Sequence, residues 1–246
     1  MSNAYGDFSA YYDLLGWNAF AKNAAVRLKA FFELRGKKPA SILDLACGTG
    51  ELEKSLRNTG IRFTGVDASA GMIRVARKKV PWGRFIVSDA ARIRLSRKFD
   101  MVLLLFDSAN HMNSYAHLLR VFRNAARHLN ESGYFIFDFL TECGLEEWEQ
   151  LNIRRKKEYT LFWYGHYYPE KMLADIFIEA FIRQTAQREK PANYRRVFQK
   201  IVEKTYPVND IIVALRGCGF SKIMASPFDP EEEIKRATRL WFVCQL

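Results

Sequence analysis

The sequence predicts an α/β protein built on a parallel β-sheet with helices on both of its faces. Strand-like apolar runs and helix-like patterns alternate for about 100 residues from Ser41 onward, as is typical of parallel sheets. The stretch "SILDLACGTGELEKSL" places a two-glycine loop between an apolar run and a helical pattern. The chain has 246 residues, of which 49% are hydrophobic and 26% are charged, and this length permits a large core.

The N-terminal part predicts one long helix and then the first strand–loop–helix unit of the sheet. Residues 8–35 carry aromatic and aliphatic side chains at helical spacing, and Gly36 is the expected stop. Residues 42–45 form a short apolar run that predicts a buried strand. After the loop, residues 51–58 have a helical pattern, and this helix is expected to stop at Gly60.

A capped helix separates the second and third predicted strands. Residues 61–66 predict the second strand, which ends in Asp67. Ser69 can cap a helix that runs through Lys79. Residues 84–87 then predict the third strand.

The fourth and fifth predicted strands flank another helix. Residues 99–106, with the sequence "FDMVLLLF", are continuously apolar, which is expected of a strand covered on both faces. A helix is expected over residues 114–129. Gly133 is expected to break it before a fifth strand over residues 134–139.

The chain changes character after the fifth strand. Residues 154–206 carry aromatic-rich runs such as "YTLFWYGHYY", separated by turn formers, and antiparallel strands fit them best. Pro207 then opens a helix that stops at Gly217, and "FSKIMAS" and "TRLWFVCQL" predict two closing strands. The expected parts are a helical segment (1–39) closing over the ligand, a sheet domain (40–150 and 207–246), and an inserted antiparallel β lid over the substrate (151–206).

The glycine loop after the first strand predicts a bound nucleoside. The dinucleotide fingerprint requires a third glycine, and Glu53 occupies that place. A pyrophosphate would also meet Asp44 and Glu51 where it needs positive potential. A cationic nucleoside without phosphate removes this conflict, and S-adenosylmethionine has these properties. Glu51 and Glu53 are assigned to the helix N-terminus and not to the ligand.

Two further carboxylates follow the next two strands. Asp67 can accept hydrogen bonds from both ribose hydroxyls, and Asp89 in "VSDA" can accept one from an adenine amino group. Each aspartate alone is more often a turn or cap residue. Three carboxylates at the ends of three successive strands, after a two-glycine loop, favour a nucleoside site.

The motifs "LDLACGTGELEKSL", "GVDASAGM" and "SDA" together resemble class I S-adenosylmethionine-dependent methyltransferases. The resemblance covers residues 40–140 and implies a Rossmann-like sheet of seven strands in the order 3-2-1-4-5-7-6, with the seventh strand antiparallel. The stretches "ALRGCGF" and "RLWFVCQL" match the usual end of that fold. The antiparallel insert resembles that of amino-sugar N-methyltransferases.

The same resemblance assigns cofactor-binding residues. Asp44, Ala46, Gly48 and Gly50 would surround the methionine part, with Ala46 in place of the family's first glycine. The remaining positions are Asp67 for the ribose, Met72 beside the adenine, Asp89 and Ala90 for recognition of the adenine, Asp107 for the loop near the transfer site, and Tyr12, preceded by Tyr11, for closing over the cofactor.

The implied reaction is in-line displacement of a methyl group onto N or O of a small-molecule acceptor. Positioning supplies most of the rate, and a base is required only when the acceptor must lose a proton early. His111, just past the fourth strand, is the candidate base. His166 could line the acceptor site, although its aromatic neighbours also fit the buried face of the inserted sheet.

Two alternative functions stay open. The net charge of +11 would suit an RNA acceptor, but the "NPPY" and "DPPY" motifs of base-modifying methyltransferases are absent from the sequence, and nucleic acid is not favoured. A non-catalytic S-adenosylmethionine-binding module would share the same loop and carboxylates.

Cysteines and hydropathy give expectations about the environment. The four cysteines lack the spacing of a metal site, so no metal is expected, and reduced thiols favour a cytoplasmic protein. No membrane partner is expected, because no stretch approaches the roughly 18 apolar residues of a membrane span, and no secretory signal is visible. The sequence leaves the oligomeric state open between a monomer and a homodimer.

Overall fold

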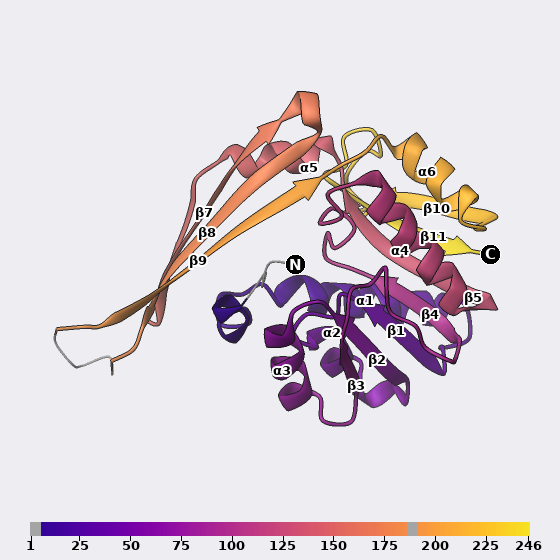
Figure 1. The fold of residues 1–246 in the computed structure, drawn as a ribbon, viewed down its shortest axis with the longest axis horizontal. Coiled ribbons are helices and arrows are strands. Elements are labelled where there is room, and N and C mark those ends of the chain that lie inside the picture. The colour runs from indigo at the N-terminus through magenta and orange to yellow at the C-terminus, as the bar shows by residue number, and fades with distance from the viewer. Residues whose placement is uncertain (1–5, 186–190) are drawn as a thin grey trace.

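Seven strands form one mixed sheet in the order β10-β11-β5-β4-β1-β2-β3 (Figure 1). The computed structural model describes residues 6–185 and 191–246. Neighbouring strands are parallel from β3 to β5, whereas β11 is antiparallel to both β5 and β10. The predicted strand order, with an antiparallel seventh strand, is therefore confirmed. The strands are β1 (Ser41–Leu45), β2 (Arg62–Asp67), β3 (Arg84–Val87), β4 (Phe99–Leu104), β5 (Leu129–Leu140), β10 (Lys222–Pro227) and β11 (Arg239–Gln245).

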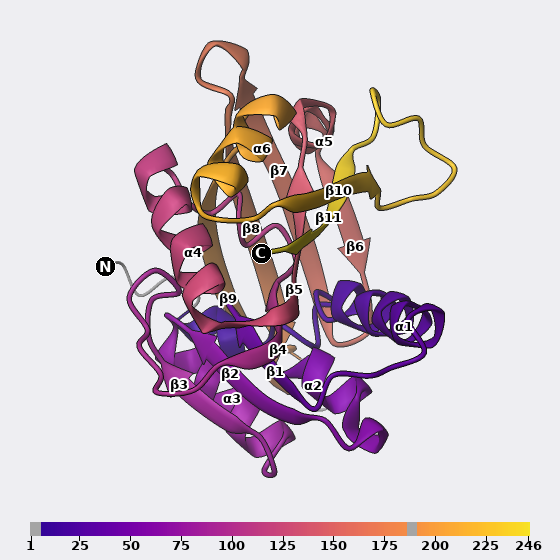
Figure 2. The same ribbon diagram turned by 90° about the vertical axis from the view of Figure 1, so that its right-hand side faces the viewer.

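Helices cover both faces of this sheet (Figure 2). One face carries α1 and α2, and the other carries α4 and α6, each pair within its own buried cluster. Ser69 caps α3 as predicted, since its hydroxyl accepts a hydrogen bond from Met72 N at 3.3 Å. No helix in the described part of the chain has the length and apolar character needed to cross a membrane. The helices are α1 (Ala19–Leu34), α2 (Glu51–Ser55), α3 (Ala70–Lys79), α4 (Tyr115–His128) and α6 (Val208–Gly217).

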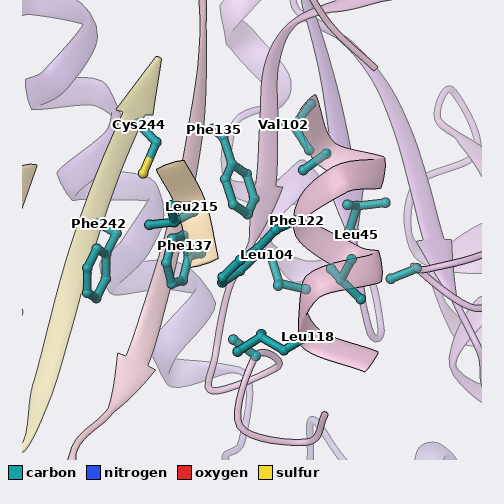
Figure 3. Packing of buried hydrophobic residues seen from close by; sticks show 14 of the residues in the cluster. Leu45, Val102, Leu104, Leu118, Phe122, Phe135, Phe137, Leu215, Phe242 and Cys244 are labelled. Atoms are coloured by element: carbon teal, nitrogen blue, oxygen red, sulfur yellow. The ribbon is translucent and has the colours of Figure 1, made fainter. Parts of the chain in front are cut away.

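The largest core fills the space between the sheet and α4 (Figure 3). Phe137 of β5 stacks on Phe242 of β11 with ring centroids 4.6 Å apart, and Phe122 of α4 lies 5.2 Å from Phe137. In β4, Val102 belongs to this core while Met101 belongs to the cluster under α1. The expectation that this strand is covered on both faces is confirmed, and the buried strands fix the positions of the loops at their ends.

A separate antiparallel sheet lies between α5 (Glu142–Glu146) and α6 in the chain, as predicted. Figure 1 shows it extending away from the seven-stranded sheet. Alternate residues of β8, such as Ile176 and Ile178, are buried, whereas Phe198 of β9 is exposed on the outer face. The lid role and the predicted domain limits stay predictions. The strands are β6 (Asn152–Arg155), β7 (Tyr159–Tyr168), β8 (Leu173–Arg183) and β9 (Tyr194–Lys204).

The predicted helix over residues 8–35 begins at Ala19 in the structure. Before it come a 3₁₀ helix, η1 (Asp7–Ala10), and a series of turns. Gly16 has a φ of +90°, a backbone conformation that ends a regular helix and that glycine adopts without strain. Phe8 is buried in the cluster under the second sheet. The aromatic spacing therefore reflects packing on that sheet and not a continuous helix.

Gly133 does not separate a helix from a strand as predicted. The α4 helix ends at His128 and β5 begins directly at Leu129, so Gly133 lies within the strand. The pairing of β4 with β5 is irregular at this point. A Cβ atom on Gly133 would come within 2.9 Å of the Asp100 carbonyl oxygen, so glycine is needed for close approach of the two backbones.

The remaining short elements refine the predicted limits. The predicted helix over residues 51–58 ends at Ser55 and continues as a 3₁₀ turn, and Gly60 with φ +73° ends it as expected. Neither α5 nor the 3₁₀ turn after it was predicted from the sequence. The 3₁₀ turns are η2 (Arg57–Thr59), η3 (Glu147–Glu149) and η4 (Pro169–Lys171).

Candidate active site

A cavity of about 760 Å³ lies at the carboxyl ends of β1, β2 and β4. The N-terminal segment and strands β8 and β9 of the second sheet complete its wall. Ligands of open parallel sheets bind at this edge, because the loops there diverge from the strand ends. The structure brings nearly all predicted site residues together along the wall: Tyr12, Asp44, Ala46, Gly48, Asp67, Met72, Asp89, Ala90, Asp107 and His111.

Two predicted residues lie elsewhere. Gly50 is not part of the cavity wall; it precedes α2 with φ +75°, and a Cβ atom there would lie 3.2 Å from the Cβ of Ala76 on α3. Its structural role is close approach of two helices, and its contact with a ligand stays a prediction. The His166 imidazole is also outside the wall, with its Nδ1 3.4 Å from Glu149 Oε1 on an exposed surface.

The loop after β1 is tied to β2 through backbone hydrogen bonds. The amides of Ala46 and Cys47 both donate to the Val66 carbonyl oxygen, at 2.7 and 3.0 Å. Ala46 has a φ of +70°, where an L side chain costs roughly 1–2 kcal/mol. The loop therefore keeps a strained backbone at the cavity, in the position where the methyltransferases that the sequence resembles have glycine.

Asp67 organises the same loop. Its Oδ2 accepts a hydrogen bond from Gly48 N at 2.9 Å, and its Oδ1 accepts one from Ser69 N at 2.8 Å. Burial raises the pKa of Asp67, and this effect outweighs the two amide hydrogen bonds, which lower the pKa. The carboxylate still lines the cavity, so it can contact a ligand while it holds two loops together.

Asp44 and Glu53 form a buried acidic pair beneath the loop. Asp44 is 3% exposed, and its Oδ1 has no hydrogen-bond partner among the described residues. Burial raises the pKa of Asp44 well above its usual range, and the nearby charges of Glu53 and Asp67 add to this. Glu53 lies in the first turn of α2, where the sequence placed it, and its side chain is completely buried there.

Asp89 follows β3 and lies beside α4. Its Oδ1 accepts a hydrogen bond from Ala91 N at 2.7 Å, and His117 Nε2 lies 3.4 Å from the same oxygen. His117 also lines the cavity, and it was not predicted. Met72 and Ala90 are both largely buried in the wall nearby, which fits their predicted place beside a flat base.

The loop after β4 is held in an unusual conformation by a buried carboxylate. Phe106 and Asp107 are consecutive residues with φ of +60° and +48°. Their amides donate to the two carboxylate oxygens of Asp138, at 2.5 and 2.9 Å. Arg239 of β11 pairs with the same carboxylate and also faces Asp107, with Nη2 3.7 Å from Asp107 Oδ2. This strained backbone positions Asp107 at the cavity.

Asp107, His111 and Glu203 form an acidic corner of the cavity. One nitrogen or oxygen atom from each lies within 4.8 Å of the others. Burial raises the pKa of Glu203 well above its usual range, and the neighbouring Asp107 raises it further. Burial lowers the pKa of His111, so the imidazole is neutral near pH 7. These groups could offer ligands to a cation, but the adjacent Arg239 guanidinium opposes a divalent ion.

The N-terminal segment closes one side of the cavity. The Tyr12 ring lies 6.5 Å from the Phe106 ring, and Phe20 stacks on Phe106 at 4.9 Å. Asp13 pairs with Lys79 of α3 at 2.5 Å and accepts a hydrogen bond from Thr49 at 2.8 Å. These contacts hold the segment on the glycine loop, although its closure over a ligand stays a prediction.

Besides His117, the sequence prediction missed two residues of the cavity wall, Glu203 and Arg239, and the buried partner of Arg239, Asp138. Glu203 lies at the end of β9, and Arg239 at the start of β11. Both reach the cavity only because distant strands pack together. Asp138 gave a weak local signal, since it is a charged residue within the apolar run "YFIFDF".

Residues 42–133 match the family model described as "Methyltransferase domain". The candidate methyltransferase YqeM of Bacillus subtilis (strain 168) is 26% identical over 98% of this chain and 96% of its own length. A dTDP-3-amino-3,6-dideoxy-alpha-D-glucopyranose N,N-dimethyltransferase of Streptomyces fradiae is 29% identical over 54% of this chain and 53% of its own length.

Solved structures share the whole fold, including the second sheet. An S-adenosylmethionine-dependent methyltransferase from Clostridium acetobutylicum ATCC 824 superimposes with a TM-score of 0.82 at 23% identity, over 98% of both chains. DesVI of Streptomyces venezuelae superimposes with a TM-score of 0.74 at 21% identity, over 97% of this chain and 98% of its own. The predicted fold is thereby confirmed: residues 42–133 match a methyltransferase domain, and the chain has the fold of the S-adenosylmethionine-dependent methyltransferase from Clostridium acetobutylicum.

Proposed function

We propose that this protein transfers a methyl group from S-adenosylmethionine to a nitrogen atom of a small-molecule acceptor, by in-line displacement. The observation that carries the proposal is a single cavity lined by two groups of carboxylates, which are called here its first and second ends. The first end is formed by Asp44, Asp67 and Asp89, which follow or end three neighbouring strands, and the second by Asp107 and Glu203 of the acidic corner. A cationic cofactor and an amine acceptor would meet between them.

The first end suits a cationic nucleoside. The unpartnered Oδ1 of buried Asp44 can accept a hydrogen bond from the cofactor's ammonium group. Asp67 would bind the ribose hydroxyls, and Asp89 with Ala90 would recognise the adenine beside Met72. When bound, S-adenosylmethionine supplies an activated methyl group on a cationic sulfur, whose leaving form is neutral. The chain's own task is to hold acceptor and donor in line and to exclude water.

The second end suits an amine. Asp107 and Glu203 together offer carboxylate oxygens, one of which, Glu203 Oε2, has no hydrogen-bond partner in the described structure. An amine must be neutral to attack, and the ionised form of Glu203 is a suitable proton acceptor because a raised pKa makes that form more basic, with His111 as the predicted base beside it. The names of relatives acting on amino sugars, such as the Streptomyces fradiae enzyme, support this choice over an oxygen acceptor.

The acidic corner also argues against an RNA acceptor. A phosphate backbone would approach Asp107 and Glu203 unfavourably, although the net charge of +11 favours polyanions at the outer surface. A non-catalytic binding module would explain the cofactor-binding end of the cavity, but it would not explain the acidic residues Asp107 and Glu203 at the second end. The expected location in the cytoplasm and the absence of a membrane partner stay predictions.

Calorimetric titration and a methylation assay test this proposal. S-adenosylmethionine and S-adenosylhomocysteine are expected to bind, and NAD is not. With a panel of amino sugars, alkyl amines and their hydroxyl analogues, methylated product should form from amines only, as detected by mass spectrometry. Glu203→Gln should lower turnover about 10²–10⁴-fold while cofactor affinity is kept. Methylation of the hydroxyl analogues alone, or preference for NAD, would contradict the proposal.

A further inference from the structure

Glu53 is a buried acid without a hydrogen-bond partner. Its side chain is completely shielded from solvent, and neither Oε1 nor Oε2 has a partner among the described residues. Buried polar atoms are nearly always hydrogen-bonded in folded proteins, because an unpaired one costs free energy. The burial of this unpartnered acid therefore calls for a physical reason.

The charged surroundings of Glu53 come from three elements. The carboxylates of Asp44 on β1 and Asp67 on β2 both interact electrostatically with it. Lys79 of α3 offers positive charge, but its ammonium group is already paired with Asp13 at 2.5 Å and with Glu51 at 2.9 Å. The region around Glu53 therefore contains more negative charges than positive ones when every carboxyl is ionised.

A buried cluster of carboxyls with this excess of negative charge is expected to keep a proton. Burial raises the pKa of Glu53 to about 7, although its own backbone amide and the charge of Lys79 oppose this. Burial also raises the pKa of Asp44, and the nearby carboxylates of Glu53 and Asp67 raise it further. Two interacting carboxyls titrate as a pair, so the proton belongs to both and not to one residue. Burial raises the pKa of Asp67 as well, but unlike Glu53 its carboxylate accepts hydrogen bonds from two amides, which oppose this rise.

We propose that Asp44 and Glu53 hold one proton between them in the cofactor-free protein and release it to solvent when the cationic cofactor binds. This inference rests on the proposed function, because it requires the ammonium group of S-adenosylmethionine to contact Asp44. Glu53 is then a positioning residue that acts on the cofactor through Asp44. A cation at Asp44 favours the ionised pair, and the proton lost from the pair is the one that binding displaces.

The direction of the pH dependence follows from this exchange. Below the pKa of the pair, the cofactor must displace a proton, and affinity rises up to about tenfold per pH unit. Above that pKa the pair is already ionised, and this contribution to affinity levels off. A glutamic acid that stays neutral in both states would exchange no proton and would leave affinity independent of pH in this range.

Calorimetry in two buffers measures the exchange directly. S-adenosylhomocysteine is titrated near pH 6.5 in phosphate and in a high-enthalpy amine buffer, and the difference in heat gives the protons released. Wild type is expected to release up to about one proton more than Glu53→Gln, whose amide cannot ionise. The ligand's own titration is the same for both proteins and cancels. Glu33→Gln, at an exposed site on α1, should behave as wild type.

A second variant guards against a folding defect. Glu53→Met removes the unpartnered oxygens, so the cofactor-free protein should melt at a higher temperature, while proton release is lost as in Glu53→Gln. Equal proton release in wild type and both variants would overturn this proposal while cofactor binding stands. Absence of any binding heat with wild type would overturn the proposed function and this proposal with it.

Discussion

The guanidinium of Arg239 pairs with the carboxylate of Asp138 across two neighbouring antiparallel strands, β11 and β5. The Asp138 side chain is fully buried, and the Arg239 side chain is 15% exposed. The same carboxylate accepts the amides of Phe106 and Asp107. One ion pair thus links the closing strand of the sheet to the loop that carries the acidic corner of the cavity.

Asp138→Asn should therefore destabilise the protein strongly. Removing one charge of a buried pair leaves the other uncompensated, and the cost is about 3–5 kcal/mol. Urea unfolding followed by circular dichroism measures this change. Glu179→Gln is the matched control, because its partner Arg196 is exposed and such pairs contribute only about 0–1 kcal/mol. Similar losses of unfolding free energy in both variants would show that the buried ion pair stabilises the protein no more than an exposed pair does.

Ala46→Gly should stabilise the protein. With φ at +70°, Ala46 pays a steric cost that glycine does not pay, and the expected net gain is about 0.5–1 kcal/mol after the entropy of the unfolded chain is included. The midpoint of urea unfolding should rise with an unchanged slope. Ala30→Gly, at an exposed position in α1, should instead lose about 1 kcal/mol. A loss in both variants would mean that the positive φ carries no strain.

The sequence predicted the sheet and one end of the cavity because their signals are local. Apolar runs mark strands, and Asp44, Asp67 and Asp89 follow strand ends that must meet at one edge. Glu203 and Arg239 had no such signal, because each enters the cavity from a strand whose position depends on long-range packing. The burial of Glu53 had no such signal either: its place near a helix N-terminus was predicted, but only the packing of α2 shows that its side chain is buried.

Stability should fall as the pH drops below about 6.5, in part through His128. Its side chain is 1% exposed, its Nε2 accepts a hydrogen bond from Leu95 N at 3.0 Å, and Nδ1 therefore donates to the Asn124 carbonyl oxygen at 2.9 Å. Burial and the nearby Arg94 and Arg127 lower the pKa of His128, with the Asn124 bond opposing. Its contribution is complete above the unfolded pKa and is lost as the pH falls through the folded pKa.

The measurement is the free energy of unfolding between pH 7.5 and pH 5. His128→Gln should reduce the slope of this curve by up to about 1.4 kcal/mol per pH unit. Part of the slope should persist, because burial also lowers the pKa of His111. An unaltered slope in His128→Gln would place the titrating group elsewhere.

Asp67→Ala should abolish most of the thermal stabilisation that S-adenosylhomocysteine confers. At a ligand concentration of 100 times the dissociation constant, wild type should gain about 2.7 kcal/mol. The variant also loses two amide hydrogen bonds, so its ligand-free melting temperature should fall as well. Asp100→Asn separates the two effects, because Asp100 accepts the amides of Ala40 and Ser41 at a site away from the cavity. That control should melt earlier and still gain the full increment on adding ligand, whereas an equal increment in Asp67→Ala would show that the ribose binds elsewhere.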